Sequence, residues 1–166
     1  EKFAGTQILT FEEWVLLCKR LDIDIYVDRK FSYTDEDIEN LFSIVDKYGM
    51  KDRTSWININ NVLNARKIKE LDSNARIGVL EHPSQNAIKR YSPYNTGRGY
   101  FFNGNAKENM TKESIELGIK AGFEVEVWYV DFDSTQEEQI FKILRQAIEY
   151  GVTGITTDHY LVNDAF

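Results

Sequence analysis

The chain has 166 residues and a net charge of −7, and 42% of its residues are hydrophobic and 13% aromatic. These values indicate one globular domain over residues 1–166 with a sizeable core. They argue against a nucleic-acid partner, because no basic stripe can neutralise phosphates, and no apolar run approaches the roughly 20 residues of a membrane span.

The single cysteine and the first residue say little about the compartment or about the length of the parent chain. Cys18 is the only cysteine, so no intramolecular disulfide can form, and we expect a small buried hydrophobic side chain there. The compartment stays open: cytoplasmic, extracellular and virion-associated locations all agree with the sequence. The sequence starts at Glu1 without an initiator methionine, which suggests that it was cut from a longer chain.

The first half of the chain alternates helix and strand patterns. Thr10 and Glu13 have the spacing of a capping box, and an apolar stripe at helical spacing follows them. Thr34 precedes three acids that favour the start of a second helix. The predicted elements are a helix from Thr10 to Leu21, a strand over 24–30, a helix from Thr34 to Gly49, a strand over 54–60, a helix over 61–71 and a strand over 76–80.

The second half continues the same alternation. Residues 83–97 are the least clear segment, and we interpret them as a short helix followed by a loop. The other predicted elements are a strand over 100–103, a helix over 111–121, a strand over 125–130, a helix over 134–150 and a short strand over 154–157. Strands that alternate with helices predict a parallel sheet with right-handed crossovers.

Two closures of such a sheet are open, a doubly wound open sheet and part of an eight-stranded barrel. A full barrel usually needs at least about 200 residues. The chain is therefore too short for eight units, and six units do not close well.

The strand over 24–30 ends in residues that can carry chemistry. Side chains alternate along a strand, so Asp28 and Lys30 lie on one side, and Arg29 lies on the other. At the carboxyl end of a parallel strand, where ligands bind, such a pair can hold a metal ion and neutralise an anion. The alternative is an ordinary solvated strand end.

Four short phrases, at residues 8–13, 28–30, 122–131 and 151–158, are informative when they are taken together. In this order and spacing they resemble the glycerophosphodiester phosphodiesterase family. The phrase at 8–13 is similar to one that has proline at the position of Leu9, and the phrase at 28–30 resembles the family's Glu-x-Lys. The phrase at 122–131 resembles its Val-Trp-Thr-Val-Asn strand, and the phrase at 151–158 its Gly-Ile-x-Thr-Asp ending.

The resemblance implies a TIM-type (β/α)8 barrel, of which this chain would supply the third to eighth strands and lack the first two βα units. The family's catalytic histidines lie on those first units, so they are expected upstream of this chain. His82 and His159 match neither position. An upstream segment or a partner chain would complete the barrel.

The resemblance also assigns roles to the strand ends. Asp28 takes the place of a metal-binding Glu with a side chain one methylene shorter, and Lys30 matches the catalytic lysine that neutralises phosphate charge. Trp128 matches the tryptophan that lines the substrate side of the barrel mouth, although a core aromatic is the alternative. Asn103 and Asn105 are expected to contact substrate.

Glu126 has the same strand parity as Trp128, so it is expected to point inward with it. There it would be either an extra acid or the partner of a base.

The implied reaction is hydrolysis of a phosphodiester, either a small glycerophosphodiester or a glycerol-phosphate polymer, with Mg²⁺ or Ca²⁺ as the divalent metal. The alternative is a barrel that has lost catalysis and binds glycerol-phosphate polymers in a virion or cell-surface protein. The departures at Asp28 and Leu9, where the family has Glu and Pro, weakly favour that alternative.

Overall fold

A computed structural model describes residues 5–28, 34–57, 59, 61–95, 100–105, 111–129 and 137–157. Within these ranges six strands form one parallel sheet in the order β1-β2-β3-β4-β5-β6. Sequential parallel order is what repeated right-handed βαβ units produce, so the predicted α/β class with a parallel sheet is confirmed. The strands are β1 (Ile25–Asp28), β2 (Thr54–Ile57), β3 (Arg76–Val79), β4 (Tyr100–Asn105), β5 (Glu124–Tyr129) and β6 (Gly154–Thr157).

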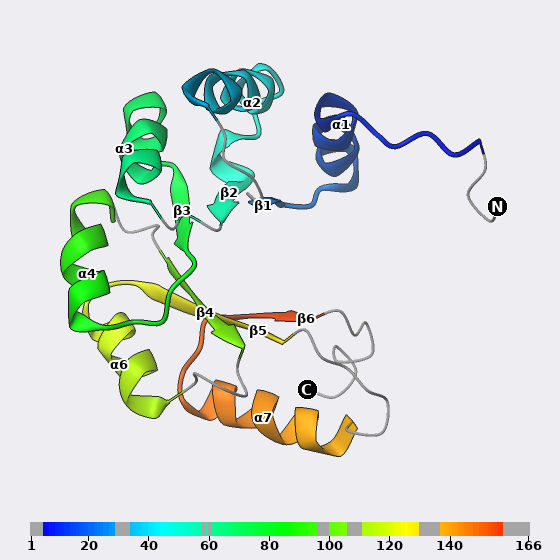
Figure 1. Cartoon of the computed structure of the whole chain (residues 1–166). Helices are drawn as coiled ribbons and strands as arrows, with labels where there is room; N and C mark the ends of the chain where they lie inside the picture. Colours follow the sequence, from blue (N-terminus) through cyan, green and yellow to red (C-terminus); the bar gives the residue numbers. More distant parts are fainter. Residues whose placement is uncertain are drawn as a thin grey trace.

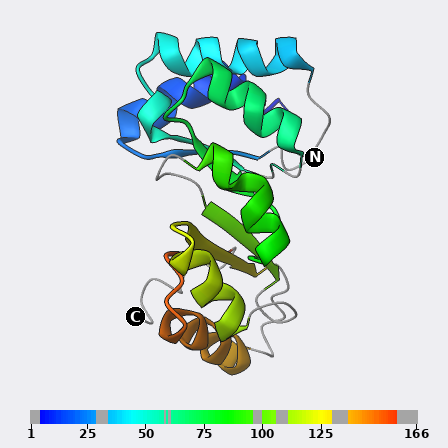
Figure 2. The same ribbon diagram turned by 90° about the vertical axis from the view of Figure 1, so that its left-hand side faces the viewer.

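The helices lie outside the strands in an arc (Figure 1). Figure 2 shows α4 between the α2–α3 pair on one side and α6 and α7 on the other. They are α1 (Phe11–Leu21), α2 (Asp35–Lys47), α3 (Val62–Leu71), α4 (Gln85–Tyr91), α6 (Lys112–Lys120) and α7 (Glu137–Glu149), with short 3-10 helices η1 (Lys51–Arg53) and η2 (Ser92–Tyr94). None of the described helices is long and apolar enough to cross a membrane.

Side-chain caps set where the helices begin. At α1 the Glu13 amide donates to Thr10 Oγ1 at 3.2 Å, and the Thr10 amide donates to Glu13 Oε2 at 2.8 Å. This reciprocal pair is the predicted capping box, which is therefore confirmed. Ser84 caps α4 by accepting from the Ala87 amide, so the unclear segment does contain a helix, followed by η2.

Some element bounds differ from the predicted ones. β2 covers Thr54–Ile57, and the Ile59 amide donates to the Gly78 carbonyl at 3.0 Å, whereas residues 58 and 60 of the predicted strand lie outside the described residues. β4 runs two residues further than predicted, to Asn105, with a register shift between Asn103 and Asn105. Other predicted segments also fall partly outside the described residues, at 29–30, 96–97, 130 and 134–136.

The core lies between the sheet and the helices. Phe42 of α2 stacks on Trp56 of β2 with ring centroids 4.2 Å apart and an interplanar angle of 9°. Cys18 is buried among these apolar residues, as expected for a small hydrophobic side chain. Alternate strand residues such as Ile25 and Val27 face this layer, so the residues between them face the concave side of the sheet.

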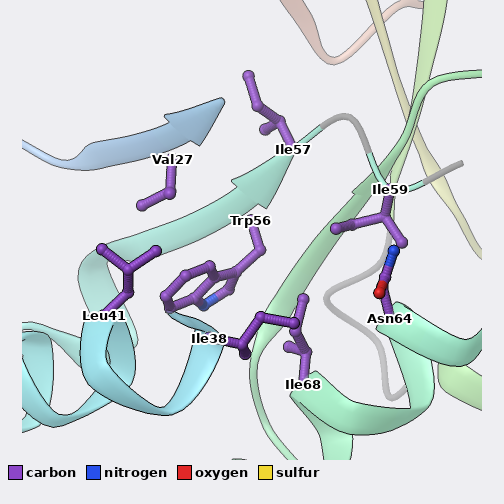
Figure 3. Close-up of a pocket in the computed structure, with 8 residues that line it drawn as sticks. All are labelled: Val27, Ile38, Leu41, Trp56, Ile57, Ile59, Asn64 and Ile68. Carbon is purple, nitrogen blue, oxygen red and sulfur yellow. The ribbon is translucent and has the colours of Figure 1, made fainter. Parts of the chain in front are cut away.

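A small apolar cavity remains in this layer (Figure 3), where Trp56 lies between α2 and α3. Its volume of about 10 Å³ is near the minimum for one water. Because the lining is almost wholly apolar, the cavity is a packing defect and not a ligand site. The lining residues are Val27, Ile38, Leu41, Trp56, Ile57, Ile59, Asn64 and Ile68.

Candidate functional site

The sheet is curled, and one contact across its concave face shows this directly. Tyr26 Oη of β1 donates to Glu126 Oε1 of β5 at 3.2 Å. In a flat sheet these strands would lie four spacings of about 4.8 Å apart, or roughly 19 Å. A tyrosine side chain cannot span that distance, so the strands must curve round a common interior, as they do in a barrel.

Arg76, the first residue of β3, is the centre of a polar cluster in this interior. Its Nη1 donates to Tyr26 Oη and to Ser55 Oγ, each at 2.9 Å. Its Nη2 donates to Glu124 Oε2 at 2.5 Å and to Glu126 Oε1 at 2.7 Å. We call these five side chains the Arg76 cluster. It joins four strands, β1, β2, β3 and β5.

The Arg76 cluster pairs one guanidinium with two carboxylates, of which Glu126 is buried and Glu124 is partly exposed. Burial alone would lower the pKa of the Arg76 guanidinium, but hydrogen bonds with Glu124, Glu126 and Tyr26 outweigh burial and raise that pKa. Burial raises the pKa of the Tyr26 phenol, which keeps it protonated as the donor to Glu126. The Glu126 side chain is only 5% exposed, so its charge depends on Arg76 for compensation.

A polar cavity of about 350 Å³ opens at the amino-terminal ends of the strands, next to this cluster. In α/β barrels the active site lies at the opposite, carboxyl-terminal ends of the strands, whereas residues at the amino-terminal ends contribute to stability. The Arg76 guanidinium at this cavity is already engaged by the cluster. The cavity residues are Asp24, Tyr26, Asp52, Arg53, Ser55, Arg76 and Glu124.

The candidate site lies one layer further along the strands, at their carboxyl ends. Asp28 is half-buried, two residues after Tyr26, and its register partner on β2 is Ile57. Ile57 in turn packs against the half-buried Trp128, two residues after Glu126 on β5. Asp28 and Trp128 therefore occupy the concave face of their strands, directly beyond the Arg76 cluster.

The other predicted site residues are placed less fully. Lys30 lies outside the described residues, and so does His159. Asn105 has the register position of Trp128, whereas Asn103 pairs with Val127, a residue buried on the helix-facing side. The roles predicted for all of these residues, and for Asp28 and Trp128, remain predictions.

Sequence reasoning missed Arg76 and Tyr26 and left Glu126 undecided. The parity argument places Glu126 inside, and the structure shows that it pairs with a base, Arg76. Tyr26 lies two residues before Asp28 on the same strand, so strand parity could have placed it on the same face as Asp28. Nothing local marks Arg76 as an interior residue, because the first residue of a strand is commonly exposed.

The described residues do not by themselves make a metal site. Within the described ranges no group of three or more His, Cys, Asp or Glu side chains could hold a metal ion. Asp28 offers one carboxylate at the candidate site, whereas Ca²⁺ takes 6–8 oxygen ligands and Mg²⁺ an octahedral set.

Comparison with known proteins places this fold. No protein-family model matches the sequence, and no curated protein does. Among solved structures, a proposed glycerophosphodiester phosphodiesterase from Galdieria sulphuraria has a TM-score of 0.72 at 17% identity, over 93% of this chain and 61% of its own. A glycerophosphoryl diester phosphodiesterase from Parabacteroides distasonis has a TM-score of 0.69 at 15% identity, over 92% of this chain and 53% of its own.

A third structure, a glycerophosphodiester phosphodiesterase from Agrobacterium tumefaciens, has a TM-score of 0.58 at 16% identity, over 87% of this chain and 57% of its own. The chain thus spans less than two thirds of the length of these proteins. The resemblance predicted from the four sequence phrases is confirmed for the fold. The chain has, over nearly its whole length, the TIM-type barrel fold of glycerophosphodiester phosphodiesterases.

Proposed function

We propose that the full-length protein is a metal-dependent phosphodiester hydrolase that acts on glycerophosphodiesters or glycerol-phosphate polymers. The observation that carries the proposal is the curled parallel sheet, which matches phosphodiesterase structures over about nine tenths of the chain. The position of Asp28 and Trp128 on the concave face at the strand ends supports it, because barrel enzymes bind their substrates there.

In this proposal each strand end has one task. Lys30 neutralises the charge that develops on the phosphoryl oxygens in the transition state. Trp128 forms an apolar wall for the glycerol moiety, and Asn105, which has the register position of Trp128, offers an amide hydrogen bond to substrate. The general acid and base are histidines of the first two barrel units, which have no counterpart in this sequence.

A divalent ion, Mg²⁺ or Ca²⁺, would polarise the phosphoryl group when bound. Asp28 is the described residue that could ligate it, and the remaining ligands would have to come from outside the described residues. No step of the proposal is derived through the ion, because one carboxylate does not make the site.

The six strands would be the third to eighth of the barrel, and the surface of α1 supports this. Val15 and Cys18 are buried against α2, but Trp14 and Leu21 on the adjoining stripe are 45% and 58% exposed. Ile23, just before β1, is 44% exposed. A preceding βα unit packed on the β1 edge would cover this apolar stripe.

The test is hydrolysis of glycerophosphocholine and of a glycerol-phosphate oligomer by the full-length protein with Mg²⁺ or Ca²⁺. Lys30→Ala should lower kcat by about 10²- to 10³-fold, the usual effect of removing one transition-state charge partner. Arg29→Ala is the matched control, because its side chain has the opposite strand parity, and it should keep wild-type activity. Asp28→Asn should weaken calorimetric metal binding by about tenfold or more.

The results separate the two functions. Wild-type activity in Lys30→Ala would remove that residue from the mechanism, and unchanged metal affinity in Asp28→Asn would refute the ligand assignment. Binding of the oligomer without hydrolysis of either substrate would favour a non-catalytic binding module.

A further inference from the structure

We propose that Arg76 is a positioning residue that holds Asp28 and Trp128 at the separation the candidate site requires. It does so through Tyr26 and Glu126, which lie two residues earlier on the same two strands. The kinetic part of this inference rests on the proposed function, whereas its structural part does not.

Within the Arg76 cluster, Arg76, Tyr26 and Glu126 each form a hydrogen bond with the other two. Arg76 binds Tyr26 at 2.9 Å and Glu126 at 2.7 Å, and Tyr26 binds Glu126 at 3.2 Å. Three mutual contacts fix a triangle, whereas a single contact would leave the two strands free to slide. The guanidinium also lies 5.7 Å from the centre of the Tyr26 ring, which restrains the ring itself.

This triangle lies directly beneath the candidate site. Each strand residue advances about 3.3 Å, so Asp28 and Trp128 lie roughly 6.6 Å beyond Tyr26 and Glu126 on the same face. A shift of β1 against β5 at the cluster therefore passes to the site almost undiminished. Misplacement of a catalytic geometry by about 1 Å can cost about 10²-fold in rate.

The side-chain chemistry selects arginine. Nη1 serves Tyr26 and Ser55 while Nη2 serves the two glutamates, a divided geometry that the planar guanidinium fixes and a lysine ammonium cannot reproduce. Well-packed apolar residues stabilise a protein interior at least as well as a buried ion pair does. What the Arg76 cluster adds is direction, because each hydrogen bond sets an angle as well as a contact.

The test compares three variants of the full-length protein by kinetics and by fluorine NMR after 5-fluorotryptophan labelling. The Trp128 resonance is the one that Trp128→Phe lacks. Arg76→Met should lower kcat by about 10²-fold with little change in KM, and it should shift or split the Trp128 resonance. Tyr26→Phe removes two sides of the triangle but keeps the ion pair, so it should have the same effects at smaller size.

Arg53→Met is the matched control. Arg53 also pairs with two acids, Asp22 and Asp24, but at the exposed amino-terminal end of the strands. It should leave kcat, KM and the Trp128 resonance unchanged.

Each outcome decides the inference. A folded Arg76→Met protein with unchanged kcat and an unchanged Trp128 resonance would overturn it. If Arg76→Met does not fold, Tyr26→Phe decides by the same readouts. If the wild type hydrolyses neither substrate, the proposed function fails alone, and the Trp128 resonance still tests the positioning role.

Discussion

Gly154 of β6 is the register partner of Glu126 on β5, so a side chain added at Gly154 would disturb the buried Glu126 carboxylate. A Cβ added there would lie 2.8 Å from Glu126 Cγ, closer than real Cβ contacts, and 3.0 Å from Glu126 Cδ, which is tighter than most of them. Glu126 cannot simply swing away, because Arg76 and Tyr26 hold its Oε1. We therefore expect Gly154→Ala to destabilise the protein, although alanine suits a strand better than glycine does.

The size of the effect follows from the two ways the clash can be relieved. A local shift of β6 against β5 is overpacking, which costs about 1–3 kcal/mol. Displacement of Glu126 would break its ion pair with Arg76 at a cost of about 3–5 kcal/mol. The relaxation with the lower free-energy cost, the shift of β6 against β5, will dominate, so the expected loss in the free energy of unfolding is about 1–3 kcal/mol.

Urea unfolding of a double-mutant cycle measures this loss. Glu126→Ala removes the Cγ and Cδ atoms that the new methyl group meets, so in that background Gly154→Ala should cost less than about 0.5 kcal/mol. Thr156→Ala, two residues along on the same face and exposed, is the control and should change stability by less than about 0.5 kcal/mol. A Gly154→Ala protein as stable as the wild type would refute the placement of Glu126 over Gly154.

Two further predictions concern the outer layer. Phe42→Ala removes the ring stacked on Trp56 and should lower the free energy of unfolding by about 3–5 kcal/mol in the same urea assay, whereas exposed Ser43→Ala should be nearly neutral. Hydrogen bonds from the Thr10 backbone and side chain lower the pKa of Glu13, so its cap stabilises α1 above the ordinary pKa of 4.5 and is lost as the pH falls through the lowered value. Between neutral and acid pH the wild type should therefore lose stability relative to Glu13→Gln, and parallel pH profiles of the two proteins would contradict this.

The sequence was sufficient wherever a local rule decides the structure. Thr10 and Glu13 predict the start of α1 correctly, because a capping box is defined by only four consecutive residues. Strand parity was enough to place Glu126 inside. The pairing of Glu126 with Arg76 was beyond reach, because those residues are 50 positions apart and meet only when the sheet curls.

Other differences have equally specific causes. The register shift in β4 depends on pairing with the neighbouring strand β5, which residue patterns alone do not specify. The short α4 was ambiguous because few apolar positions fit into one or two turns, and its Ser84 cap is the signal that identifies it.

The alternation of Glu124, Val125, Glu126 and Val127 has a different meaning here from its usual one. Strands of a parallel sheet are normally covered on both faces and are apolar on both, whereas alternation is typical of an antiparallel sheet with one wet face. In β5 both valines are fully buried against helices, but Glu126 is buried as well, on the concave face. Alternation in this chain therefore separates a helix-facing side from a charged barrel interior, and not a core from solvent. Because the same parity continues to Trp128 on β5 and from Tyr26 to Asp28 on β1, the residues that fix the strands and the residues proposed to bind substrate share one face.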